Sequence, residues 1–516
     1  MRVFGVFLLL WVSCSGYKFL VYNPKFGRSQ VMFLGKIADI LAQGNHTVIN
    51  YVTDISSSFN DTGSKIAETW FRPRKYVSDY DIGSFHIAAW LVDWSSLNVY
   101  GMFAEIGQEF RLSCEDQLND TEFLHRLKEQ NFDVGFSEYF DTCGFQIFKK
   151  IGIKKHILVY SSAMPQSDAT WFGVPATPSI TPDIGYGYTP EMTFFERVSN
   201  YLTYNFNMYL FLPALYETSK AYKNVYGEEF DHRKAFAESQ YYFVNTDEHL
   251  DFPQLITHKR VHIGGLGMEN GDLKADLPKD MEEQISKFKK GFILVSFGTV
   301  AASYAMPEGH KKAFLEAFQQ FPEILFIWKY ERDDDFGKEV RNLHKSTWVP
   351  QRSLLSHPRA LAFLTHSGLN SVTEATNAGV PMINIPLFAD QMYNSAMALT
   401  KGIGYRVDKF GISKDTLANA IRTVVDDPGY KRRSKELSRM IRAKPMGPDE
   451  RIRKYSEFAA EFDVASNLDI HGRDVNFFVF YSLDVIAFLL SIIAIAFYGI
   501  YRMITLIFRR QKRKTE

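Results

Sequence analysis

Short apolar runs alternate with amphipathic stretches along most of the chain. Near the N-terminus, the apolar run 17–24 is followed by a turn (25–30), a helical stretch (31–42) and a second apolar run (46–53). Strand, helix and strand at this spacing predict a parallel βαβ unit. The same pattern predicts a helix at 143–152 and further strands at 132–136, 157–162, 242–248 and 260–266.

The second half begins at Gly291 and repeats the alternation more clearly. Strands are predicted at 292–299, 323–330, 360–368 and 380–388, with helices starting at about Leu369 and Asp390. Nearly continuous apolar strands are typical of parallel sheets buried on both faces. Strands alternating with helices predict a doubly wound α/β fold.

The two ends of the chain carry longer apolar segments. Residues 1–16 combine one arginine, an apolar run and small residues, with Cys14 and Gly16 at positions −3 and −1 before a cleavage point, which predicts a signal peptide. An uncharged run, 485–501, extends to 508 and is long enough to cross a bilayer. The basic tail 509–516 predicts a cytosolic C-terminus, a type I topology and a luminal body.

Three sequons, at Asn45, Asn60 and Asn119, give weak support to a luminal body. Lys512 and Lys514 resemble the lysine-based retrieval signal of type I membrane proteins of the endoplasmic reticulum. The aromatic-rich segment 193–213 could touch the membrane, line an apolar acceptor pocket or form a core helix with one apolar face. We take the core helix as the expectation.

Composition excludes some classes of protein. The 516 residues are 46% hydrophobic and 23% charged, as in a globular protein of several domains. Lys and Arg number 59, as do Asp and Glu, so the chain is not a globally basic nucleic-acid binder. Outside the predicted signal peptide only Cys114 and Cys143 remain, which leaves one disulfide or two free thiols open.

The candidate chemistry lies between residues 348 and 391. His366, Gly368, Asn370 and Ser371 lie where a buried strand meets a helix, and free N–H groups at such a junction suit a diphosphate. Glu374 follows one helical turn later, where it could bind ribose hydroxyls. Two further pairs complete the set: Trp348 and Gln351 offer a stacking plane and an amide to a base, and Asp390 and Gln391 could bind sugar hydroxyls.

This stretch resembles the donor-binding signature of UDP-dependent glycosyltransferases, and most closely that of the membrane-bound UDP-glucuronosyltransferases of animals. The pattern W-x-P-Q, H-x-G-x-N-S-x-x-E, G-V-P and P-x-F-x-D-Q is met in order within 348–391. The resemblance implies a GT-B fold, with two Rossmann-like domains facing a cleft and one C-terminal transmembrane helix. It also implies inverting sugar transfer from a UDP-sugar co-substrate to a lipophilic small molecule, without a cofactor or a metal ion.

The resemblance further implies an organisation of the chain. Residues 17–270 would bind the acceptor, 271–290 would be a linker, 291–440 would bind the UDP-sugar, and 441–484 would return toward the N-terminal domain and the membrane helix at 485–508. The implied donor-binding residues are Ser296, Gly298, Thr299, Trp348, Gln351, His366, Gly368, Asn370, Ser371, Glu374, Asp390 and Gln391.

One position departs from the family pattern. Similar enzymes carry a general-base histidine in the first loop, steered by a carboxylate, and the corresponding residues here are Gln30 and Glu138. An amide cannot take up a proton at neutral pH. Three interpretations follow: transfer to acceptors that need little deprotonation, Glu138 acting as the base, or a donor-binding partner of an active relative that has no turnover itself.

Other classes fit less well. A retaining glycosidase would need two carboxylates flanking one bond and no nucleotide site. A lipid receptor would not need the spacing of Trp348, His366 and Glu374. The sequence leaves open whether the donor is UDP-glucuronate or UDP-glucose, which acceptor is used, and whether the chain forms homo- or hetero-oligomers with relatives.

Overall fold

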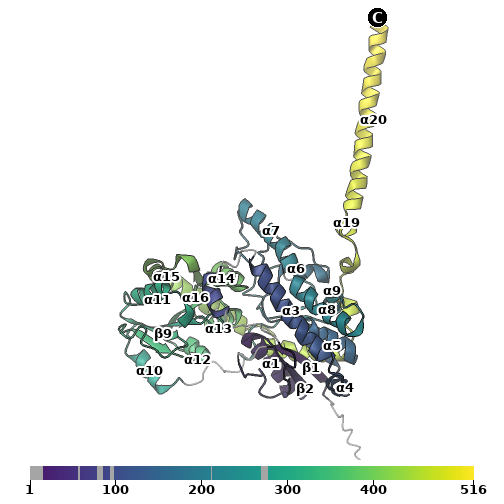
Figure 1. The fold of residues 1–516 in the computed structure, drawn as a ribbon. Coiled ribbons are helices and arrows are strands. Elements are labelled where there is room, and N and C mark those ends of the chain that lie inside the picture. Colours follow the sequence, from purple (N-terminus) through teal and green to yellow (C-terminus); the bar gives the residue numbers. More distant parts are fainter. Residues whose placement is uncertain are drawn as a thin grey trace, which may run out of the picture.

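The computed structural model describes residues 16–55, 59–77, 85–92, 98–210, 212–268 and 277–515. Two α/β halves lie side by side, and one long helix leaves the N-terminal half (Figure 1). The predicted signal peptide falls almost entirely outside the described residues, as does part of the predicted linker.

The N-terminal half contains a seven-stranded parallel sheet in the order β3-β2-β1-β4-β5-β6-β7. The predicted first βαβ unit is present, because β1 and β2 pair in parallel from Lys18↔Thr47 to Lys25↔Asp54 across the connecting helix α1. The strands are β1 (Lys18–Lys25), β2 (Thr47–Asp54), β3 (Glu68–Arg72), β4 (Val134–Glu138), β5 (His156–Tyr160), β6 (Tyr242–Val244) and β7 (Arg260–His262).

Helices cover both faces of this sheet, and α3 lies along α8 on one of them (Figure 1). Buried aromatic and aliphatic side chains fill the space between the sheet and each helical layer. The helices are α1 (Arg28–Gln43), α2 (Phe85–Leu91), α3 (Asn98–Leu118), α4 (Thr121–Lys128), α5 (Cys143–Ile151), α6 (Gln166–Ala169), α7 (Phe194–Leu210), α8 (Leu212–Tyr226) and α9 (His232–Ala237).

The C-terminal half contains a six-stranded parallel sheet in the order β10-β9-β8-β11-β12-β13. Its central strand β8 is buried at every position and β11 at all but one, as their unbroken apolar runs predict. The strands are β8 (Gly291–Ser296), β9 (Ile324–Lys329), β10 (Leu343–Ser346), β11 (Ala360–Thr365), β12 (Met382–Asn384) and β13 (Gly404–Arg406). The helices are α10 (Lys279–Ser286), α11 (Glu308–Phe318), α12 (Gln351–Ser356), α13 (Leu369–Ala378), α14 (Gln391–Thr400), α15 (Lys414–Asp426) and α16 (Pro428–Arg442).

After α16 the chain crosses back to the N-terminal half. Helix α17 (Pro448–Glu461) buries Ile452 and Ala459 in the core beside α1. Lys444, just before it, pairs with Asp247 at 2.5 Å, and both side chains are almost fully buried. A short α18 (Ala465–Leu468) follows. These contacts fix the two sheets relative to each other.

The question of the two cysteines is settled by a disulfide between Cys114 of α3 and Cys143 at the start of α5, with the Cα atoms 5.4 Å apart. Both cysteines are fully buried. The bridge ties α3 to the segment that directly follows β4.

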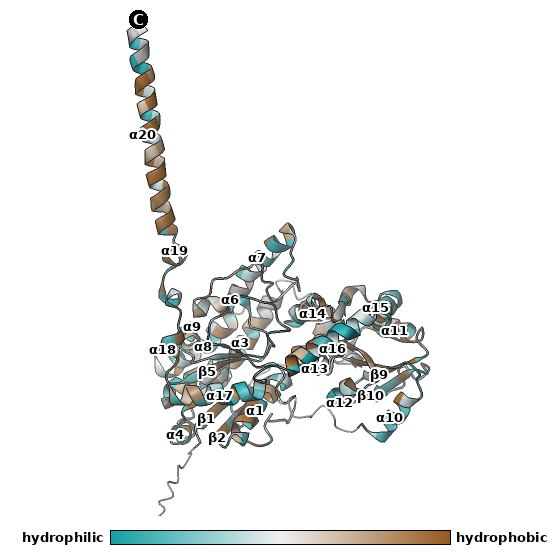
Figure 2. Ribbon diagram, turned by 180° about the vertical axis from the view of Figure 1, so that it is seen from behind, coloured by the Kyte–Doolittle hydropathy of each residue, from teal (hydrophilic) through white to brown (hydrophobic). Residues whose placement is uncertain are grey.

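The last helices leave the body of the protein. A short α19 (Phe477–Phe480) precedes α20 (Leu483–Thr515), whose residues Leu483–Arg510 are long and apolar enough to span a membrane and are not buried against the rest of the chain. Figure 2 shows apolar residues along much of α20 and hydrophilic ones toward its C-terminal end. This helix confirms the predicted C-terminal membrane segment; the side chains of Lys512 and Lys514 lie outside the described residues.

The expectation of a core helix within 193–213 is wrong. Helix α7 projects from the N-terminal half (Figures 1 and 2), and several of its apolar side chains face outward. Phe195 is 79% exposed and Leu202 is 62% exposed, whereas the polar Asn200 is buried and binds loop carbonyls. An apolar pattern alone does not say which face of such a helix meets the core.

Candidate functional site

The predicted residues gather at the carboxyl ends of the two sheets. In each parallel sheet the chain first adds strands on one side and then crosses to add strands on the other. This switch, or reversal point, falls between β1 and β4 in one sheet and between β8 and β11 in the other. Open parallel sheets bind ligands at such reversal points. Gln30 follows β1 and Glu138 ends β4, while Ser296 ends β8 and His366 follows β11.

Gln30 and Glu138 form a direct pair across the first reversal point. The Gln30 Nε2 donates to Glu138 Oε2 at 3.1 Å. The other carboxyl oxygen, Oε1, accepts from the backbone N–H of Ser161 at 3.1 Å and from its hydroxyl at 2.7 Å. Glu138 is only 2% exposed. The side chains at the two positions predicted for the base and its carboxylate are therefore in contact through this amide–carboxyl hydrogen bond.

The electrostatics of Glu138 are unusual for a glutamate. The pKa of Glu138 is raised to about 7, because burial and, to a smaller extent, the nearby buried Asp141 raise it more than the two donors from Ser161 lower it. The carboxyl group therefore changes charge close to neutral pH.

His366 lies between two glycines of the C-terminal half, which is called the donor half below because it carries the predicted donor residues. A Cβ atom placed on Gly298 would come within 2.8 Å of the imidazole, and one on Gly368 would come within 2.5 Å. A side chain at either position would therefore displace the imidazole, and Gly298 also has a positive φ of 79° that favours glycine. Burial lowers the pKa of His366 to about 4, with a further contribution from the nearby Lys329, so the ring is neutral at physiological pH.

The turn after His366 is held in a strained conformation. Ser367 has φ of 65°, a region that non-glycine residues rarely adopt. Its hydroxyl donates to Asn384 Oδ1 at 3.0 Å, and its carbonyl accepts from Asn394 Nδ2 at 3.1 Å. This buried network offsets the strain and fixes the start of α13, where Gly368 is the N-cap residue and no side chain caps the helix.

The first turn of α13 carries Asn370, which is exposed, and Ser371, which is almost buried. Uncapped N–H groups at a helix start can bind an anion. Asn370 Oδ1 accepts from Asn245 Nδ2 of the N-terminal half at 3.3 Å. The sequence offered no signal for a role of Asn245 in joining the halves.

The predicted base and ribose residues cluster beside α13. Gln351 Nε2 donates to Glu374 Oε2 at 2.7 Å and to Ser371 Oγ at 3.3 Å. Arg352, which the sequence analysis missed, donates from Nε to Glu374 Oε1 at 2.9 Å. Trp348 is 65% exposed, so a large part of its indole surface is open to a planar ligand.

Asp390 and Gln391 lie where the chain enters α14. The amide oxygen of Gln391 accepts from the backbone N–H groups of Leu387 and Phe388, so this side chain shapes the loop after β12. Asp390 accepts from Asn394 Nδ2 at 2.8 Å, and burial raises the pKa of its carboxyl group.

The loop after β8 is the last part of the site. Ser296 is almost fully buried, and its Oγ accepts from the N–H of Gly298 at 3.4 Å. Thr299, in contrast, is exposed. Lys329, at the end of β9 and not predicted from sequence, donates to the carbonyl of Gly298. The structure thus brings the predicted donor residues to one edge of the C-terminal sheet.

Comparisons with known proteins agree with this geometry. The model of the family "UDP-glucoronosyl and UDP-glucosyl transferase" matches residues 18–516. Curated relatives include "Putative UDP-glucuronosyltransferase ugt-48" of Caenorhabditis elegans, 29% identical with 95% of each chain covered. UDP-glucuronosyltransferase 2A2 of Homo sapiens is 28% identical, covering 90% of this chain and 87% of the relative.

Solved structures share the fold at low sequence identity. The glycotransferase of kitacinnamycin aligns with a TM-score of 0.58 at 17% identity, covering 86% of this chain and 98% of its own. Phytolacca americana UGT2, complexed with UDP-2fluoro-glucose and pterostilbene, aligns with a TM-score of 0.56 at 17% identity, covering 87% and 99%. The two-sheet architecture is therefore the GT-B fold.

Proposed function

Because the chain belongs to the UDP-glucoronosyl and UDP-glucosyl transferase family and is thus a UDP-dependent glycosyltransferase, we propose that it transfers glucuronate from UDP-glucuronate to lipophilic acceptors that are nucleophilic without a general base. Neutral aromatic amines and ionised phenols meet this condition. The names of the glucuronosyltransferase relatives support this donor, and UDP-glucose is the alternative.

The observation that carries the proposal is the hydrogen bond from Gln30 to Glu138. It commits the Nε2 of Gln30 to the carboxyl group and leaves its Oε1 as the atom that can accept an N–H of the acceptor. The amide can orient an acceptor but cannot take up its proton. Glu138 is too deeply covered to serve as a direct base, because Gln30 lies over one oxygen and Ser161 binds the other.

The reaction then proceeds by attack of the acceptor on C1 of the sugar, opposite the bond to UDP, with inversion. The new C–N or C–O bond forms as the C1–O bond to the diphosphate breaks, and UDP leaves with the bonding electrons. An amine acceptor loses its proton to water after attack. We propose that the N–H groups at the start of α13 and the neutral imidazole of His366 stabilise the negative charge that develops on the diphosphate.

For the remaining ligands, we propose that Trp348 and Gln351 bind uracil, Glu374 binds ribose, and Asp390 binds the sugar. In the cell we propose a single-pass type I protein of the endoplasmic reticulum membrane with a luminal body, retrieved by Lys512 and Lys514. The exposed Asn45, Asn60 and Asn119 are the candidate glycan sites.

The test compares transfer by membranes that carry the wild type, Gln30→His, or the control Gln43→His, which adds a histidine at the exposed far end of the same helix. Labelled UDP-glucuronate and UDP-glucose are each offered with an aromatic amine, phenols of graded acidity and an aliphatic alcohol. The wild type and Gln43→His should glycosylate the amine and show rates that rise with phenol acidity. Gln30→His should raise alcohol transfer by about 10²-fold or more.

Two outcomes would contradict the proposal. Equal rates for the alcohol and the acidic phenols in the wild type would mean that a base is present elsewhere. UDP binding without transfer by either the wild type or Gln30→His would favour a second candidate function, that of a donor-binding partner of an active relative. The amide at the predicted base position is compatible with this function as well. His366→Ala, which should weaken UDP binding, is the control for donor binding.

A further inference from the structure

A short helix of the N-terminal half is embedded in the C-terminal half. Helix α2 belongs in sequence between β3 and α3, yet its residues Ala89 and Trp90 are buried within the core of the donor half. Ala89 is fully buried and Trp90 is 2% exposed. In Figure 1 α2 is the short dark blue helix among the green elements near α14.

Trp90 contacts the loop that follows β8. Its indole Nε1 donates to the carbonyl of Ala302 at 3.1 Å, and its ring meets Phe297 edge-on, with the ring centroids 4.9 Å apart. Gly298 and Thr299, two of the predicted donor-binding residues, lie between these contact points in the chain. The indole therefore holds both ends of the segment that carries them.

The donor half holds the same loop from its own side. Ser303 donates its backbone N–H to Glu331 Oε2 at 2.7 Å and its hydroxyl to the carbonyl of Lys329 at 2.9 Å. These bonds anchor the C-terminal end of the loop, and Lys329 also donates to the carbonyl of Gly298 near its start. The contacts of Trp90 with Phe297 and Ala302 add an element of the other half to this fixation.

Lys409 connects α2 to a second donor loop. Its ammonium group donates to the carbonyl of Val92 at 2.7 Å and approaches that of Ala89 at 3.4 Å, at the C-terminal end of α2. The same group donates to the carbonyl of Leu387 at 2.7 Å. Leu387 lies in the loop after β12 that leads to Asp390. A cation at a helix C-terminus is favourable, and this lysine is only 7% exposed.

We propose that α2 is a positioning element for the UDP-sugar, in which Trp90 and Lys409 hold the loops after β8 and β12 in their donor-binding arrangement. The inference rests on the proposed function, because it assumes that these two loops bind the donor. Neither residue touches the reacting atoms. Its consequence is that donor affinity depends on an element of the N-terminal half, which is predicted to bind the acceptor.

The experiment measures UDP affinity by equilibrium dialysis with labelled UDP and the full-length, detergent-solubilised protein. Trp90→Phe keeps an aromatic ring but loses the indole donor, and Lys409→Met keeps the apolar stem but loses the ammonium. The matched controls are Trp70→Phe, which loses an indole bond to Glu68, and Lys155→Met, which loses an ammonium bond to the carbonyl of Ala460. Both controls lie away from the donor loops.

We expect Trp90→Phe, which loses one buried hydrogen bond, and Lys409→Met, which loses those to Val92 and Leu387, each to weaken UDP binding by at least about fivefold. The controls should stay within about twofold of the wild type. The KM for the UDP-sugar should rise in parallel, while the KM for the acceptor changes less. Lys409→Arg, which keeps a cationic donor, should recover most of the affinity. A purely structural role would lower thermal stability without this selectivity.

Two results would overturn the inference and can be told apart. Unchanged UDP affinity in both variants, with normal binding by the wild type, would remove the role of α2 and leave the proposed function standing. Absence of UDP binding by the wild type itself would overturn both. If Trp90→Phe folds poorly, the comparison of Lys409→Met with Lys409→Arg decides the question alone.

Discussion

At the residue scale, the amide–carboxyl pair of Gln30 and Glu138 determines what chemistry remains available. The amide of a glutamine neither gains nor loses a proton at neutral pH, so its contribution depends on whether its N–H or its oxygen faces the acceptor substrate. While Glu138 is ionised, it can only accept, and it holds the Nε2 of Gln30. Once protonated, Glu138 can itself donate a hydrogen bond to Oε1 of Gln30 after the amide rotates. That oxygen is then no longer available to bind the acceptor substrate.

This orientation predicts a pH dependence. Since burial raises the pKa of Glu138 to about 7, the ionised form that orients Gln30 is present above that pH and lost below it. With an aromatic amine that stays neutral over this range, transfer should rise through pH 7 and then level off. Glu138→Gln should remove the step and lower the plateau rate, because its amide can either donate or accept.

The measurement is kcat at saturating UDP-sugar against pH, with the wild type and Glu138→Gln side by side. Ser161→Ala is the matched control, because it removes a donor that lowers the pKa of Glu138 and should move the step to higher pH without removing it. A flat profile for the wild type would mean that the charge of Glu138 does not control the orientation of Gln30.

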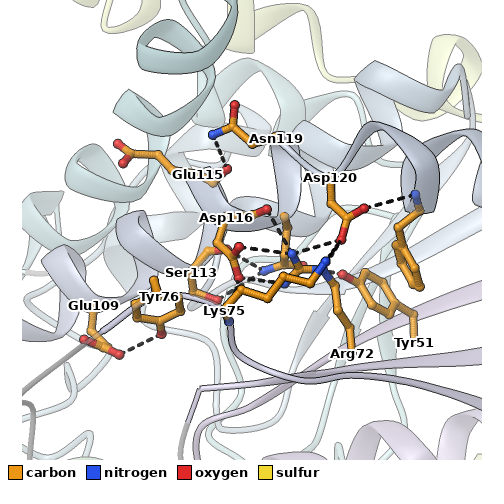
Figure 3. A network of polar contacts seen from close by, with 12 residues as sticks. Tyr51, Arg72, Lys75, Tyr76, Glu109, Ser113, Glu115, Asp116, Asn119 and Asp120 are labelled. Atoms are coloured by element: carbon orange, nitrogen blue, oxygen red, sulfur yellow. Dashed lines mark hydrogen bonds and ion pairs between the residues drawn. The ribbon is translucent and has the colours of Figure 1, made fainter.

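At the element scale, the edge strand β3 shows how the N-terminal sheet is tied to its helices (Figure 3). Arg72 ends β3 and is almost fully buried. Its guanidinium group donates to both carboxylate oxygens of Asp116, at 2.7 and 3.1 Å, and to Asp120 at 3.2 Å. Lys75 reaches the same Asp120 carboxylate at 2.7 Å from a mostly exposed position.

Arg72→Met should therefore destabilise the protein far more than Lys75→Met. Removing the buried cation leaves Asp116 without its charged partner and Asp120 with Lys75 alone, and breaking such a buried pair costs about 3 kcal/mol. The exposed lysine contributes less than about 1 kcal/mol because water screens it. Urea denaturation of the two variants in detergent would measure the difference in free energy of unfolding. Equal effects would show that burial does not strengthen this pair.

The elements also show what the sequence can and cannot predict. The runs that became β1, β2, β8 and β11 were predictable because both faces of these strands are buried, which leaves an unbroken apolar signal. The edge strand β10 has no buried residue, so its pattern carries no such signal. The predicted donor residues could be proposed from their spacing, whereas Trp90 and Lys409 could not, because contacts between the halves leave no local periodicity.

At the scale of the whole molecule, a single helix determines which side of the membrane the site occupies. Helix α20 leaves the body as an isolated rod, and its basic end lies farthest from the sheets (Figures 1 and 2). Positive charge at one end of a membrane helix favours the cytosol. Because the two halves and α17 form one body on the other end, the donor and acceptor sites must lie on the same side.

We therefore expect the body to be protected in sealed microsomes, while an epitope tag added after Glu516 is removed by external protease. Glycan addition provides an independent readout, since Asn60 and Asn119 are exposed and glycosylation is luminal. Asn60→Gln and Asn119→Gln should each remove one endoglycosidase-sensitive mass step if both sites are used. Digestion of the body in intact vesicles, or a protected tag, would reverse the assigned topology. In that case the UDP-sugar would come directly from the cytosol, and Lys512 and Lys514 could no longer act as a cytosolic retrieval signal.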